Sequence, residues 1–171
     1  MTILKDLKEN VFKVLEDYMS LEEFERWLYG SEALFSLISE DVVLEVYAFN
    51  YKQRDVKHQF KEVVFKYFDD EEFLLWKVKS NLCDLIANRN NRDSILYDFY
   101  CLGYDDYCFL HSIGCYLYQI EDIEYYGNNL ATVLVELKGD CEDLLSEIEK
   151  QELESPGFKL KDYCRVSKQN I

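Results

Sequence analysis

Proline occurs only once in this chain of 171 residues, at Pro156, and glycine occurs only six times. Both residues interrupt regular backbone, so their scarcity predicts long, continuous elements. Apolar side chains recur at helical spacing along much of the chain; in residues 3–19 they are Leu4, Leu7, Val11, Val14, Leu15 and Tyr18. Apolar residues make up 49% of the sequence, which is enough for a buried core. The sequence therefore predicts an all-α fold, arranged as one compact multi-helix domain over residues 1–171.

Capping patterns place several helix ends. Ser20 and Glu23 fit a capping box, in which each side chain bonds the backbone N–H of the other residue. The helix that follows is expected to stop at Gly30 in the left-handed conformation. Asp69 and Glu72 repeat the capping pattern before another long helix. Helical patterns also cover residues 31–38, 54–68, 93–103, 104–120 and 140–153.

Two segments fit a strand as well as a helix. Residues 41–49 are rich in β-branched side chains, but no turn or partner strand lies nearby, so a helix is favoured. Residues 130–137 leave open a minor β element within the all-α fold. Pro156 and Gly157 then break the chain, and we expect the basic C-terminal tail over residues 156–171 to fray.

The chain is strongly acidic, with 34 acidic residues against 19 basic ones and a formal net charge of −15. Phosphate groups repel such a surface, so direct binding to nucleic acid or to an anionic membrane is disfavoured and a basic partner is favoured. The simpler interpretation is that the charge only keeps the protein soluble. The charged start of the chain is not a signal peptide, and no apolar run could span a bilayer, so we expect a cytoplasmic protein.

The six cysteines do not point to a disulfide framework. Without a signal peptide, we expect them to be reduced and mostly buried as small apolar residues. Cys108, His111 and Cys115 would share one helix face near Cys101, a spacing that a soft metal could use. However, no CxxC pair is present and the neighbouring residues are apolar, as on an ordinary core face. We predict no bound metal and no other cofactor.

Signatures of catalysis are also missing from the sequence. His111 could activate a nearby thiol, but no third group that would orient the pair stands out. The sequence has no GxSxG, no phosphate-binding glycine loop and no HExxH. Carboxylates are too numerous for any pair to indicate acid–base chemistry. We therefore predict no catalytic residue, and a cysteine- or metal-dependent enzyme is the weakest of the alternatives.

Tyrosine and acidic residues alternate in three segments, over residues 97–100, 104–107 and 121–126. Tyrosine offers a large, rigid contact area at low entropic cost, and adjacent carboxylates attract lysine and arginine. Helical spacing also allows Tyr97 or Tyr100 to be a core residue. The predicted partner-binding residues are Asp98, Tyr104, Asp105, Asp106, Glu121, Asp122, Glu124, Tyr125 and Tyr126.

Several short segments follow one another in the order seen in a known family. They are residues 19–29 (MSLEEFERWLY), residues 49–52 (FNYK), Phe73 with Trp76-Lys77, Phe99-Tyr100, Gly103-Tyr104, Phe109-Leu110 and Ile113-Gly114. Over residues 18–127 this order resembles the small helical immunity proteins encoded beside bacterial polymorphic toxins, including those of contact-dependent growth inhibition systems. The resemblance implies a protein that binds and neutralises a cognate toxin, often a nuclease, inside the producing cell. It transfers no functional residue, because immunity proteins diverge where they contact the toxin.

The charge and the resemblance agree on the kind of partner. Nucleases present a basic cleft, which an acidic, tyrosine-rich protein can occupy by imitating the charge of nucleic acid. We therefore expect an immunity protein that blocks its toxin stoichiometrically. The alternative from another class is a helical scaffold or regulatory adaptor without a toxin partner, which an apolar groove would favour. Neither the identity of the toxin nor the oligomeric state follows from the sequence.

Overall fold

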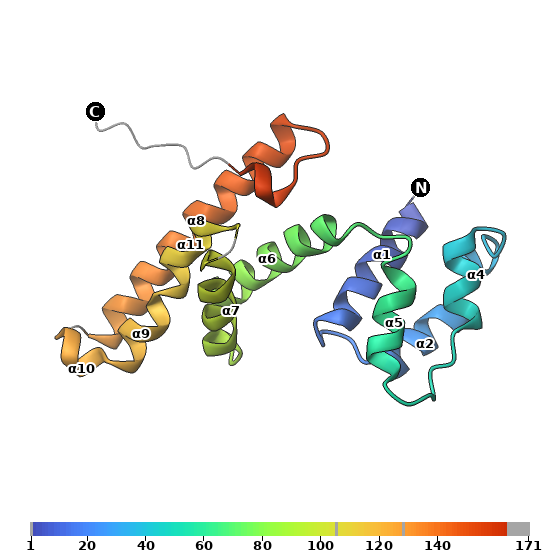
Figure 1. Ribbon diagram of the computed structural model, residues 1–171, viewed down its shortest axis with the longest axis horizontal. Coiled ribbons are helices and arrows are strands. Elements are labelled where there is room, and N and C mark those ends of the chain that lie inside the picture. Colours follow the sequence, from blue (N-terminus) through green and yellow to red (C-terminus); the bar gives the residue numbers. More distant parts are fainter. Residues whose placement is uncertain (1, 105, 128, 164–171) are drawn as a thin grey trace. The chain divides into compact units, whose positions relative to one another are not determined.

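The computed structural model describes residues 2–104, 106–127 and 129–163, and every regular element within these ranges is a helix (Figure 1). The prediction of an all-α fold is confirmed for them, and none of their helices is long and apolar enough to cross a membrane. The elements are α1 (Thr2–Leu15), α2 (Leu21–Gly30), α3 (Glu32–Phe35), α4 (Asp41–Ala48), α5 (Val56–Val64), α6 (Asp70–Ile86), α7 (Arg92–Tyr104), α8 (Cys108–Gly114), α9 (Tyr116–Glu121), α10 (Ile123–Tyr126), α11 (Leu130–Glu154) and the 3-10 turn η1 (Leu160–Asp162).

The chain divides into two compact units, Met1–Lys77 and Val78–Ile171. Helix α6 contributes its first half to the first unit and its second half to the second. The expectation of one domain over residues 1–171 stays a prediction, because the compactness of each unit does not tell whether either folds alone.

The first unit is built around an aromatic core. Phe24, Leu28 and Phe60 are fully buried, and the ring of Phe12 lies 5.2 Å from that of Phe73 and 5.8 Å from that of Trp76, measured between centroids. Ring pairs of this kind contribute about 0.5–1.5 kcal/mol beyond the area that they bury. Trp27 and Trp76 both pack against this core.

The capping box at Ser20 is formed as predicted. The backbone N–H of Glu23 donates to Ser20 Oγ at 3.2 Å, and the N–H of Ser20 donates to Glu23 Oε2 at 2.8 Å. Helix α2 does end at Gly30, but that glycine is not left-handed. The reason is that Ser31 closes α2 with an extended backbone and at once starts α3, its hydroxyl accepting from the N–H of Leu34 at 3.3 Å.

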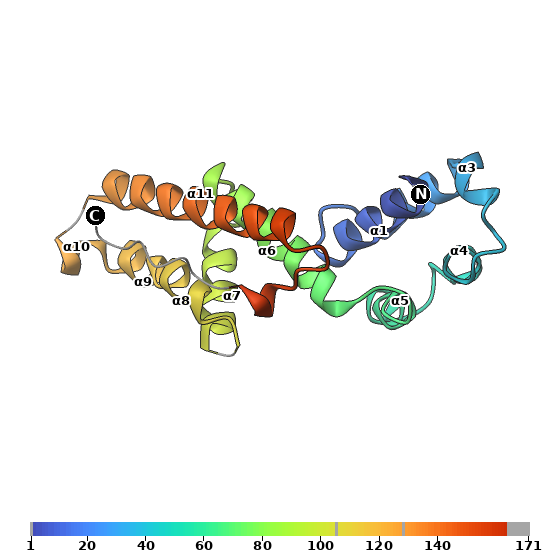
Figure 2. The same cartoon turned by 90° about the horizontal axis from the view of Figure 1, so that it is seen from above.

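The second unit packs α11 along the row formed by α8, α9 and α10 (Figures 1 and 2). The possible β element near residues 130–137 is not formed, because this segment is the first part of α11. The side chain of Asn129 caps it by accepting from the N–H of Ala131 at 2.8 Å. The β-branched residues of this segment favour a strand locally, but the helix buries one continuous apolar stripe. The stripe consists of Val133, Leu137, Cys141, Leu144 and Ile148.

Two glycines let α7 and α8 pack backbone against backbone. A Cβ atom on Gly103 would lie 2.6 Å from the Cα of His111, and one on Gly114 would lie 2.3 Å from the backbone nitrogen of Tyr100. Only a hydrogen fits at such distances. The helical patterns over residues 93–103 and 104–120 do not by themselves predict this close contact.

Buried polar groups fix the loop between α6 and α7. Asp84 is 4% exposed and accepts from Arg89 Nη1 at 3.0 Å and from Asn91 Nδ2 at 3.0 Å. Asn88 turns the chain with a φ of 51°, a conformation that asparagine tolerates better than most residues. A polar loop therefore follows α6, which ends at Ile86, and α7 begins at Arg92.

The chain beyond α11 turns at Gly157, whose φ is 84°, and returns to the second unit. Leu160 is fully buried, the ring of Tyr163 lies 4.3 Å from that of Phe109, and the Tyr163 hydroxyl donates to Glu147. Within residues 156–163 of the predicted tail, Leu160 and Tyr163 therefore pack against the second unit. Residues 164–171 lie outside the described residues.

The cysteines differ from expectation in their burial. Of the five that the structure describes, all of them free thiols, Cys141 is buried, Cys115 is half-buried and three are exposed: Cys83, Cys101 and Cys108. The prediction of mostly buried cysteines is wrong because apolar neighbours take the core positions, such as Leu82 on α6 and Phe99 on α7. Cys164 lies outside the described residues.

The protein is expected to lose stability at alkaline pH. Burial raises the pKa of the Cys141 thiol to about 12, and it also raises the pKa of the Tyr51 and Tyr116 hydroxyls. Unfolded cysteine and tyrosine titrate near about 8.5 and 10, so these groups favour the folded state fully below those values, and their contribution is lost as pH rises toward the folded pKa.

The melting temperature, followed by circular dichroism, should therefore be level near pH 7 and fall above about pH 9. In Cys141→Ala the fall in melting temperature should begin nearer to about pH 10, because only the two buried tyrosines then contribute to the pH dependence. A melting temperature that stays level up to about pH 12 would contradict the burial of these groups.

Candidate functional site

The predicted partner-binding residues lie on α7, α9, α10 and the adjoining turns. Among those whose side chains are described, only Asp98 is half-buried, and the exposed ones are Tyr104, Asp106, Glu121, Asp122, Glu124 and Tyr125. Asp105 and the side chain of Tyr126 lie outside the described residues. The exposed side chains are therefore available to a partner, whereas that of Asp98 is only partly accessible.

Charge is distributed very unevenly around these positions. No lysine or arginine occurs between Arg92 and Lys138. The same stretch contains eight carboxylates: Asp93, Asp98, Asp105, Asp106, Glu121, Asp122, Glu124 and Glu136. Since the stretch supplies no permanent cation of its own, α7 to α10 and the start of α11 favour a cationic partner. We call this region the acidic stretch, residues 93–137.

Aromatic rings in the acidic stretch form one connected group, which we call the tyrosine cluster: Tyr100, Tyr104, Tyr118 and His111. The Tyr100 ring lies 4.9 Å from Tyr104 and 5.0 Å from Tyr118, measured between centroids. His111 lies 5.1 Å from Tyr100 and 4.9 Å from Tyr104. The cluster draws on three helices, and it forms because the glycines between α7 and α8 let Tyr100 and Tyr104 reach His111.

The tyrosine cluster is both exposed and rigid. Tyr104 is 66% exposed and Tyr118 is 38% exposed. The hydroxyls of Tyr100 and Tyr104 lie 2.7 Å apart, and this hydrogen bond is the main reason that the pKa of Tyr104 is raised. The Tyr104 phenol therefore stays neutral over the ordinary pH range. Rings that are already held in place lose little freedom on binding, which is what an interface requires.

Sequence reasoning only partly identified this cluster. It named Tyr104 but treated Tyr100 as a possible core residue and did not single out Tyr118. Tyr100 is in fact half-buried, and Tyr97 is 57% exposed, so neither is a core residue. A usable signal was present in the spacing of four residues between Tyr100 and Tyr104, which places both rings on one helix face.

Tyrosine also meets carboxylates outside the three sequence segments. The Tyr116 hydroxyl donates to Asp140 Oδ2 at 2.8 Å, and Tyr163 donates to Glu147. Both carboxylates lie on α11, so these pairs join residues far apart in the sequence. These two pairs could not be predicted from the alternation of tyrosine and acidic residues, because that pattern concerns only neighbours in the sequence.

The cysteine and histidine that the sequence analysis considered together are in contact. His111 Nδ1 lies 3.4 Å from Cys115 Sγ, one helical turn away, whereas Cys101 and Cys108 are exposed. Within residues 2–104, 106–127 and 129–163, no group of three or more His, Cys, Asp or Glu side chains could hold a metal ion. The geometry therefore gives a thiol–imidazole contact beside the tyrosine cluster.

No protein-family model matches the sequence, and neither a curated protein nor a solved structure matches it. The resemblance to immunity proteins therefore stays a prediction. The features of the protein that bear on its function are the acidic stretch and the tyrosine cluster.

Proposed function

We propose that this chain is an immunity protein, which binds a basic toxin domain through α7 to α10 and blocks it without turnover. The observation that carries the proposal is the acidic stretch, which combines eight carboxylates and no lysine or arginine with a partly exposed group of tyrosines in contact with one another. A toxin that cleaves nucleic acid needs a cationic cleft, and this surface is complementary to one. The proposal includes a cytoplasmic location, where such a toxin would act.

The two features of the surface would act at different stages of binding. The carboxylates attract the cationic partner over a distance, which raises the rate of encounter. After docking, the exposed rings of Tyr104, Tyr118 and Tyr125 supply buried area and hydroxyl hydrogen bonds, which slow dissociation. No chemical step is required, because occupying the cleft is sufficient for inhibition.

A helical adaptor without a toxin partner is a second candidate, and one observation favours it. A groove on the first unit is lined by four apolar residues, Leu44, Ala48, Phe49 and Val63, together with eight polar or charged ones. Grooves of this kind accept amphipathic helices. The adaptor would bind its partner there and would not protect a cell from a toxin.

The decisive experiment uses the toxin domain encoded by the neighbouring open reading frame. Co-expression should protect the cell, and the purified proteins should form a one-to-one complex with a Kd below about 10 nM, near −11 kcal/mol. Inhibition should be stoichiometric, with complete loss of toxin activity at one equivalent.

Hen egg-white lysozyme, a basic protein that is not a cognate partner, provides the control for non-specific charge attraction. It should bind at least about a thousandfold more weakly. If the neighbouring toxin is neither bound nor inhibited, the immunity proposal fails and the adaptor is favoured.

A further inference from the structure

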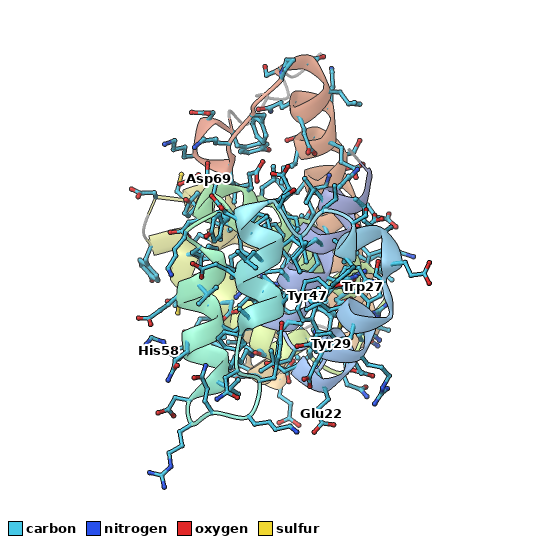
Figure 3. All side chains as sticks on the ribbon, turned by 90° about the vertical axis from the view of Figure 1, so that its right-hand side faces the viewer. Glu22, Trp27, Tyr29, Tyr47, His58 and Asp69 are labelled. Carbon is cyan, nitrogen blue, oxygen red and sulfur yellow. The ribbon has the colours of Figure 1, made fainter. Side chains whose placement is uncertain are left out.

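The first unit carries an aromatic surface of its own, built from α2, α3 and α4. The ring of Tyr47 lies 5.5 Å from that of Tyr29 and 6.0 Å from that of Phe35, both in edge-on geometry. We call these three residues the aromatic triad. Tyr29 is 56% exposed and Phe35 is 61% exposed, and Leu44 on the same helix as Tyr47 is 51% exposed. Figure 3 looks onto this unit and shows Tyr29 and Tyr47 close together.

Packing explains the two tyrosines of the triad but not the phenylalanine. The Tyr47 hydroxyl donates to the carbonyl of Leu28 at 2.7 Å, and the Tyr29 hydroxyl donates to the carbonyl of Tyr47 at 3.2 Å. These carbonyls are in the last turns of α2 and α4, and that of Leu28 also accepts from the backbone N–H of Ser31 at 3.2 Å. Phe35 has no polar atom, and more than half of its ring faces solvent. An exposed aromatic surface of this kind is typical of a contact site.

Carboxylates outnumber cations in the segment of sequence that carries the triad. No lysine or arginine occurs between Arg26 and Lys52, whereas this stretch contains Glu32, Glu40, Asp41 and Glu45. Glu32 lies one turn before Phe35 on α3 and is exposed.

Tyr29 also faces a pocket with two further carboxylates. Glu22, Glu25 and Tyr51 line this pocket with Tyr29, and Leu21, Arg26 and Lys52 complete its wall. Figure 3 shows Glu22 and Tyr29 on the side turned to the viewer. The wall of this pocket therefore holds two carboxylates and two cations, and Glu32 on α3 is the carboxylate one turn from Phe35.

We propose that the aromatic triad is a docking site for a basic amphipathic helix of a protein partner. Apolar side chains of that helix would cover Phe35, and its lysine or arginine side chains would face Glu22, Glu25 and Glu32. The carboxylates of residues 27–51, with no lysine or arginine among them, disfavour nucleic acid and anionic lipid, which leaves a cationic protein segment as the occupant that matches both the charge and the apolar rings. The site does not depend on the partner being a toxin, and it goes beyond the function proposed for α7 to α10.

The test uses the full chain, labelled with ¹⁵N, and a helical peptide of leucine and lysine with one apolar face. Two peptides serve as controls: one with glutamate in place of lysine, and one of the same composition with the residues shuffled so that no apolar face forms. The amide signals of Tyr29, Phe35 and Tyr47 should shift with the basic amphipathic peptide. Both control peptides should shift them at least tenfold more weakly.

Matched variants separate a contact role from a general effect. Phe35→Ser should weaken peptide binding at least tenfold, whereas Leu153→Ser, which removes an 84% exposed side chain from α11, should leave it unchanged. Glu32→Lys should weaken binding, while Glu154→Lys, with the same change in net charge at an exposed position on α11, should have little effect. Because Phe35 also contacts Tyr47, Phe35→Tyr tests the fold: it keeps the ring and should keep the binding.

The proposal is overturned if Phe35→Ser binds the peptide as tightly as wild type, or if the glutamate peptide binds equally well. It is also overturned if only signals from α7 to α10 shift, which would place peptide binding at the surface assigned to the toxin. Loss of this site would leave toxin binding through α7 to α10 unaffected, so the two proposals fail separately.

Discussion

Gly114→Ala is expected to destabilise the protein by about 3 kcal/mol, the largest effect on stability that a single added methyl group should have in this chain. The new Cβ would lie 2.3 Å from the backbone nitrogen of Tyr100 and 2.5 Å from its Cα. Both atoms belong to the main chain of α7, so relief requires the two helices to separate. The melting temperature, followed by circular dichroism, should fall by about 10 °C or more.

Gly139→Ala provides a control with the opposite sign. Gly139 lies inside α11, and nothing is within 4 Å of the position where its Cβ would be. Alanine there should stabilise the helix by up to about 1 kcal/mol, since glycine loses more backbone freedom on folding. If Gly114→Ala melted at the wild-type temperature while Gly139→Ala rose, the close packing of α7 on α8 would be wrong.

Features that depend on neighbouring residues were predictable from the sequence. The capping box at Ser20 needs only Glu23, three residues further along, and both of its hydrogen bonds are formed. A helix was predicted over residues 41–49 because no partner strand lies nearby in the sequence, and α4 at Asp41–Ala48 confirms it. In each case the information lies within one or two helical turns.

Features that depend on a second helix were not predictable in this way. Glycine can end a helix or permit two helices to pack closely. Only the position of α8 against α7 shows that Gly103 and Gly114 permit close packing. Residues 130–137 have local β propensity, yet the buried stripe that continues to Ile148 makes them helical. Tertiary packing decided both outcomes.

The same distinction applies to the candidate sites. The sequence predicted Tyr104, Glu121 and Tyr125 as partner-binding residues, and all three side chains are exposed in the structure. It could not identify Phe35, because an aromatic residue in a helical apolar pattern is more often a core residue. The short helix α3 buries Leu34 instead and turns Phe35 outward, a choice that depends on how α3 packs.

Single changes on the acidic stretch are expected to alter toxin binding in two separable ways. Glu121→Lys, and likewise Asp106→Lys, should slow association about tenfold at low ionic strength, because each removes a steering charge and adds a repulsive one. The loss should shrink as salt is added, since screening shortens the reach of the field to about 8 Å at physiological ionic strength. Dissociation should change little.

Truncation of a ring should act on dissociation instead. Tyr104→Ala removes a 66% exposed ring and its hydroxyl partner for Tyr100, and Tyr125→Ala removes an 87% exposed ring. If either is a central contact, the complex should weaken by about 1–4 kcal/mol, mainly through faster dissociation. Tyr104→Phe keeps the ring, so it should lose only the part that depends on the hydroxyl, about 1 kcal/mol.

Surface plasmon resonance at two salt concentrations measures both rates for every variant, and Asp6→Lys is the matched control. Asp6 is exposed on α1, and its reversal changes the net charge by the same amount as Glu121→Lys. If Asp6→Lys slowed association equally, net charge rather than the acidic stretch would drive the encounter. If the charge reversals did not change the association rate and the ring truncations did not change the dissociation rate, the toxin would bind elsewhere. At a contact surface, loss of a carboxylate should slow association and loss of a ring should speed dissociation.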